Sequence, residues 1–179
     1  MTATRHIDLK TVLQERVSGV YGDLVTRPTG KAVRGGVEDE LATMDGEAVV
    51  VIDFSTVRIL DISCADEIVG KLLMSRQDAR YFLLQGVSDA HRDAIEQVLE
   101  RHQLAVLARD REGHIQVLGH VEDTARAVFA TLSDSGAADL DEIAARLSWP
   151  RATAQEALDE LLTHRLVQLT SDQYIPLST

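Results

Sequence analysis

Asp61 and Ser63 place a carboxylate and a hydroxyl group at the start of a segment with helical periodicity, where they could form a functional site. That segment, about residues 63–76, repeats apolar side chains at i, i+1, i+4 and i+5. A phosphate on Ser63 would lie at the positive end of the helix dipole, within reach of free amide groups. The alternative, which we favour, is that Ser63 only caps the helix, since residues 63–66 are themselves a capping pattern.

A second candidate site is the basic stretch at residues 26–34. Arg27, Lys31 and Arg34 are spaced i, i+4 and i+7, so they share one face near a helix start. Together with Thr29 and exposed amide groups they could bind an anion or a nucleotide phosphate. The stretch is not a P-loop, because the upstream glycine and the Ser/Thr after the lysine are missing. We favour a basic face that is solvated or pairs with acidic neighbours.

For the other residues that could bind a metal or react, we favour structural roles. Asp53 ends a buried strand, where a loop-bonding aspartate is the favoured interpretation. Cys64, the single thiol, could have a lowered pKa at a helix start, but free cysteines are usually small core residues. His91 and His102 would lie about 16 Å apart along one helix, so they cannot share a metal ion. We therefore expect no catalytic residues, no metal and no cofactor.

Composition narrows the class of protein. The 179 residues carry 18 Lys+Arg against 29 Asp+Glu, a net charge of -11, which repels phosphate backbones at long range. One cysteine excludes a disulfide framework and fits a reducing, cytoplasmic setting. The chain has no apolar run of about 20 residues for a membrane helix, and its first residues do not resemble a signal peptide.

Residues 1–119 predict an α/β domain in which strands alternate with helices. The β-branched run at 48–54 indicates a strand that is buried on both faces. Asp8 is available to cap the first helix, and Ser88 a later one. The full set of expected helices is 8–19, 28–44, 63–76 and one that starts at 88, and the expected strands are 20–26, 48–54, 80–85, 104–108 and 114–118, with a turn at 110–113.

Residues 120–179 predict a second, smaller domain with a winged helix-turn-helix fold. Helices are expected at 121–133 and 151–164. Between them, Asp139 and Glu142 predict a capping box for a short helix. A hairpin is expected from 166–169 and 173–177, around a turn at 170–172.

The net charge of this second domain helps to indicate whether it binds DNA or protein. It carries 4 arginines and 10 acids, a balance of -6, whereas a DNA-reading winged helix usually presents several basic side chains. Arg151, Thr153 and Gln155 on the predicted recognition helix could read bases, but Glu156 and Asp159 beside them would face phosphates. We favour use of this domain in protein–protein interaction, with DNA binding as the alternative.

The segment AVVVIDFSTVRILDISCADEIVGKLL, which begins at residue 48, resembles the STAS domain of sulfate transporters and anti-sigma-factor antagonists. The preceding TRPTGKAVR is similar to a STAS-like family of unknown function, and the resemblance covers about residues 5–119. It implies that Ser63 matches the serine that a partner kinase phosphorylates in the antagonists, with Asp61 retained. Ile62 and Cys64 replace the serine and glycine of that loop.

The sequence therefore predicts a non-enzymatic regulatory protein, in which a STAS-like switch or sensor is coupled to an acidic winged helix that binds a protein. A regulator or a kinase is the expected partner, and a homodimer is an option. The alternatives are a DNA-binding transcriptional regulator and a small-ligand or nucleotide binder.

Overall fold

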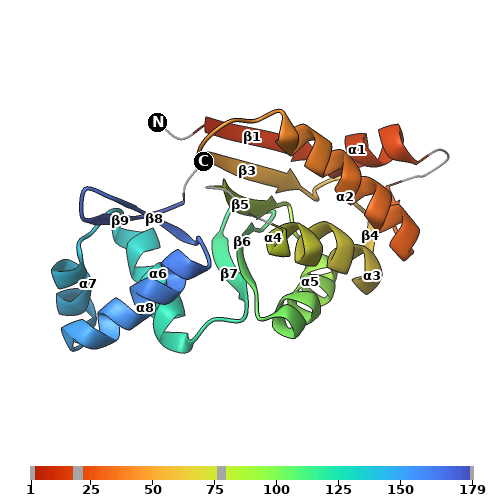
Figure 1. Cartoon of the computed structure of the whole chain (residues 1–179). Coiled ribbons are helices and arrows are strands. Elements are labelled where there is room, and N and C mark those ends of the chain that lie inside the picture. Colours follow the sequence, from red (N-terminus) through yellow and green to blue (C-terminus); the bar gives the residue numbers. More distant parts are fainter. Residues whose placement is uncertain (1–2, 18–21, 76–79, 178–179) are drawn as a thin grey trace. The chain divides into compact units, whose positions relative to one another are not determined.

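The computed structural model describes residues 3–17, 22–75 and 80–177, and these form an α/β fold with a mixed sheet. The chain divides into two compact units, Met1–Gly119 and His120–Thr179 (Figure 1). The terminal hairpin is a separate two-stranded sheet and does not continue the large sheet of the N-terminal unit. The large sheet confirms the predicted α/β class. Within the described residues, no helix has the length and apolar character needed to cross a membrane.

The N-terminal unit contains a five-stranded sheet in the order β1-β3-β5-β6-β7. Its parallel strands are β1 (Ala3–Asp8), β3 (Ala48–Asp53), β5 (Arg80–Gln85) and β6 (Ala105–Arg109), and β7 (Ile115–Gly119) is antiparallel to β6. The β-branched run forms β3, whose first five residues are all buried, as the sequence predicted. β1 was not predicted, because only Ile7 of this edge strand is buried and its sequence has no alternation of apolar residues.

Two short strands, β2 (Asp23–Leu24) and β4 (Ile59–Leu60), form a separate parallel pair. The expected strand at 20–26 is thus shorter, and its first two residues lie outside the described residues. β4 lies between the expected strand at 48–54 and the expected helix at 63–76, where no strand was expected. Asp61 donates its backbone N–H to the carbonyl of Leu24, which helps to hold the two short segments together.

The helices of this unit pack against one face of the sheet. Alternate residues of a strand point to opposite faces, and the main hydrophobic core includes Val50 and Ile52 of β3 but neither Val49 nor Val51. They are α1 (Leu9–Arg16), α2 (Arg27–Ala42), α3 (Ile62–Ala65), the π-helical η1 (Asp66–Lys71), α4 (Leu72–Met74) and α5 (Asp89–His102). α3, η1 and α4 form one continuous helical run, which packs against α2 and α5. Asp8 and Ser88 cap α1 and α5, as predicted.

The C-terminal unit consists of helices followed by a hairpin. Its elements are α6 (Asp123–Ser135), α7 (Leu140–Leu147), α8 (Arg151–Thr163), β8 (Val167–Thr170) and β9 (Gln173–Pro176). The predicted capping box of Asp139 and Glu142 is confirmed, with both reciprocal hydrogen bonds present. Ser171 and Asp172 have φ values of 50° and 63°, the left-handed pair that a two-residue hairpin turn requires.

Candidate functional site

The start of α3 is built around the carboxylate of Asp61. Its Oδ1 accepts hydrogen bonds from the backbone N–H of Cys64 and from the hydroxyl of Ser63, both at 2.8 Å. Its Oδ2 accepts the backbone N–H of Thr26 at 2.9 Å. Asp61 is therefore the N-cap of α3, and the expectation that Ser63 caps this helix was wrong. Ser63 is instead the second residue of the helix, and its half-buried hydroxyl donates to the cap.

Asp61 also joins α3 to the beginning of α2, since Thr26 is the residue before α2. Thr26 has a φ of 70°, an unusual value for a β-branched residue, and its side chain does not cap its own helix. The thiol of Cys64 donates to the carbonyl of Thr26 at 3.0 Å. A Cβ on Gly30 would stand 2.9 Å from the Cα of Cys64, so only glycine permits this approach of α2 to α3.

These contacts set the protonation states at the helix start. Burial alone would raise the pKa of Asp61, but the hydrogen bonds from Cys64, Thr26 and Ser63 outweigh it and lower that pKa. For Cys64, burial and the neighbouring Asp61 carboxylate raise the pKa to about 12. The fully buried Cys64 is thus a protonated core residue, which confirms the structural interpretation over a reactive thiol.

Next along the same helical run, η1 buries two consecutive carboxylates, Asp66 and Glu67, which are 7% and 1% exposed. Arg27 donates to Asp66 at 2.7 Å and to Glu67 at 2.8 Å. Lys71 also donates to Glu67, and His102 contacts Asp66 at 2.8 Å. Burial opposes ionisation of both acids, but the hydrogen bonds and positive charges of these partners outweigh it and lower the pKa of each acid. π-helical turns occur often at functional sites, and this one brings both acids to face cations.

The predicted anion site has a different arrangement from that expected. Arg27 and Arg34 both face Glu67, with Arg34 Nε 3.2 Å from its Oε2 in an ion pair without hydrogen-bond alignment. The hydroxyl of Thr29 lies 3.2 Å from that of Thr26, and Lys31 is exposed. The two guanidinium groups are therefore already paired with carboxylates, in agreement with the favoured interpretation that the basic face pairs with acidic neighbours.

Sequence reasoning missed Asp66 and Glu67 as members of this cluster. The i, i+4 spacing of Glu67 and Lys71 was the local signal that could have marked them. Their other partners lie on α2 and α5, where Arg27 and His102 are 39 and 36 residues away from Asp66 along the chain.

The other candidate residues have local structural partners. Asp53 accepts the backbone N–H of Ser55 at 2.7 Å, as a loop-bonding aspartate should. His91 is buried and completes the capping box of α5 with Ser88. Among the residues that the structure describes, no group of His, Cys, Asp and Glu is arranged to hold a metal ion.

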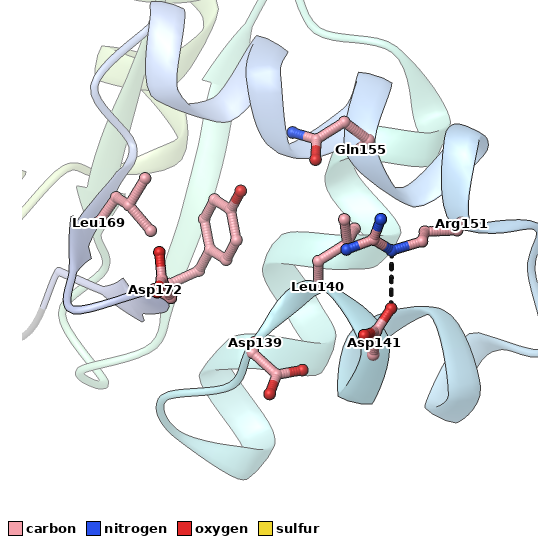
Figure 2. A pocket seen from close by; sticks show the side chains of 8 residues that line it. Asp139, Leu140, Asp141, Arg151, Gln155, Leu169 and Asp172 are labelled. Carbon is pink, nitrogen blue, oxygen red and sulfur yellow. Dashed lines mark hydrogen bonds and ion pairs between the residues drawn. The ribbon is translucent and has the colours of Figure 1, made fainter.

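α8 carries Arg151, Thr153 and Gln155, the residues that could read bases if the unit bound DNA. Arg151 Nε donates to Asp141 of α7 at 2.7 Å, and Gln155 donates to Asp159 at 2.7 Å (Figure 2 shows the first pair). Thr153 is half-buried in the first turn of α8. The two side chains with base-reading chemistry are thus both engaged by carboxylates.

No protein-family model matches this chain, and no curated protein is significantly similar to it.

Proposed function

We propose that the protein is a non-enzymatic regulator, in which a STAS-like N-terminal unit acts as a switch and a winged helix-turn-helix unit binds a partner protein. The observation that carries this proposal is the pairing of Arg151 with Asp141 and of Gln155 with Asp159. An exposed helix face on which carboxylates occupy the basic and amide groups repels phosphate and suits a protein surface.

The order of elements supports the STAS-like assignment. A buried strand, β3, is followed by a loop that ends in Asp61-Ile62-Ser63 and then by a helical run. The Ser63 hydroxyl lies 2.8 Å from an ionised carboxylate oxygen. A phosphate on Ser63 would replace this hydrogen bond with repulsion between two anions and would change the surface at the start of α3. Modification at this position is therefore a means of switching partner binding.

The order of helices and hairpin in residues 120–179 supports the winged helix assignment. A DNA-binding regulator is the second candidate, because Arg151 is on an exposed face of α8 with its side chain 68% accessible. Its pairing with Asp141 and the ten acids of the unit oppose this candidate. A nucleotide-binding role gains no support, since Arg27 and Arg34 are both turned to Glu67.

Fluorescence anisotropy with duplex DNA tests the choice between a protein partner and DNA. We expect no measurable binding at physiological salt, where non-specific DNA binders have dissociation constants of about 1–100 µM. Arg126→Ala on α6 is the matched control for Arg151→Ala, because both variants remove one arginine from the same unit. Sub-micromolar, sequence-selective binding that is lost only in Arg151→Ala would overturn the proposal.

Mass spectrometry of the protein from its native cells tests the switch. The proposal expects a phosphate on Ser63 and a Ser63→Asp variant that folds but differs from Ser63→Ala in the proteins it binds. An unmodified Ser63, together with identical partners for the two variants, would leave only a structural role for this serine.

A further inference from the structure

The hairpin and the beginnings of α7 and α8 enclose a cleft of about 380 Å³ on the C-terminal unit. Figure 2 shows side chains from all three elements arranged around it. Its lining residues are Asp139, Leu140, Asp141, Arg151, Gln155, Leu169, Asp172 and Tyr174. The volume falls within the range of roughly 300–1,000 Å³ that is usual for ligand pockets.

The charges around this cleft favour a cationic occupant. Asp141 and Arg151 form an ion pair, so their charges balance. Asp139 contributes a further carboxylate, although one of its oxygens also accepts the backbone N–H of Glu142. Asp172 is exposed on the hairpin turn, and no hydrogen bond or ion pair joins its carboxylate to the described part of the chain. Within the described part of the chain, neither Asp139 nor Asp172 is paired with a cationic side chain.

The walls of the cleft also carry apolar surface. Leu169 of β8 is 48% exposed and presents its aliphatic side chain to the cleft. Leu140 is half-buried at the first position of α7, and Tyr174 is 7% exposed. Duplex DNA would bring phosphates against two carboxylates and leave this leucine surface without a complementary partner. A protein segment that combines a cation with an apolar side chain complements both features.

We propose that this cleft binds a segment of a partner protein in which an arginine or lysine stands beside an aliphatic side chain. The cation faces Asp139 and Asp172, and the aliphatic group covers Leu169. This inference rests on the proposed function, because it names the chemistry of the partner that the C-terminal unit would bind.

NMR titration of the ¹⁵N-labelled full chain tests the inference, with a blocked peptide of alternating arginine and leucine as the probe. We expect shift changes confined to the starts of α7 and α8 and to the hairpin. One comparison peptide has glutamate in place of arginine, and another has serine in place of leucine. Each should bind more weakly than the probe by about five-fold or more, because exposed ion pairs and small apolar contacts are each modest.

The variant Asp139→Asn/Asp172→Asn removes the charges of both acids and preserves the local backbone. Asparagine is as good an N-cap as aspartate, and it tolerates the left-handed conformation of residue 172. We expect about a five-fold loss of affinity for the probe, with two exposed ion pairs as the source. The control Asp123→Asn/Asp134→Asn makes the same change in net charge on α6 and should alter affinity by less than about two-fold.

Equal losses in the two double variants, shifts outside the cleft, or equal binding of the serine peptide would overturn the inference. If the probe fails to bind and duplex DNA causes no shifts either, the cleft assignment fails and the proposed function survives. Shifts at the same residues with duplex DNA at sub-micromolar affinity would instead contradict the proposed function itself.

Discussion

Replacing Asp61 with alanine should lower the free energy of unfolding of the N-terminal unit by about 2–3 kcal/mol. The loss of an N-cap costs about 1 kcal/mol. The hydrogen bond from Thr26 to the charged carboxylate adds about 1.5 kcal/mol, the lower end for charged acceptors, because water reaches the exposed Thr26. The Ser63 hydroxyl can rebind to water and adds little.

Urea unfolding followed by circular dichroism measures this change, and two further variants assign it. Asp61→Asn retains one acceptor oxygen for the Cys64 amide but cannot also accept from Thr26, so it should lose about half as much stability. Ser63→Ala should lose less than about 1 kcal/mol, because Ser63 is not the cap. A Ser63→Ala loss equal to or larger than that of Asp61→Ala would refute the assignment of Asp61 as the cap.

Three further predictions concern the ionisable side chains of the same unit. The folded protein has lowered pKa values for Asp61, Asp66 and Glu67, so these acids should stabilise it fully above about pH 4.5, the ordinary range of carboxyl pKa values. This stabilisation should be lost as the pH falls through the folded pKa values. Thermal unfolding between pH 7 and pH 3 measures the loss, and a constant Tm would contradict it. Glu67→Gln should lower the free energy of unfolding in urea by about 2–3 kcal/mol. This is below the usual range for a broken buried ion pair, because the cationic partners of Glu67 keep contact with water. An unchanged urea midpoint would contradict a stabilising role for these ion pairs. With a pKa of about 12, the Cys64 thiol should resist a disulfide reagent at pH 8 in the native protein and react in urea, whereas rapid native labelling would show an accessible thiolate.

Local patterns predicted the elements whose determinants are local. The apolar run of β3 marks a strand without knowledge of its neighbours, and the spacing of Asp139 and Glu142 marks the start of α7 in the same way. β1 could not be predicted in this way, because its place in the sheet is set by pairing with β3 and not by its own exposed side chains.

The errors at the candidate site have a common physical origin in distant partners. Asp61 and Ser63 are both good caps two residues apart, and the choice between them involves the amide of Thr26, which is 35 residues away in the chain. The burial of Glu67 depends likewise on Arg27, 40 residues away. A single sequence shows which residues are able to cap or to pair, but the tertiary fold decides which partners they meet.

Photo-crosslinking in the cells that produce the protein tests most directly whether α8 meets a protein or DNA. The photoreactive amino acid p-benzoylphenylalanine replaces Glu156, which is exposed on α8, and a control chain carries it at the exposed Ala130 of α6. The proposed function predicts a discrete protein adduct that resists nuclease, forms from position 156, and is absent from position 130. A nuclease-sensitive DNA adduct from position 156 would contradict it.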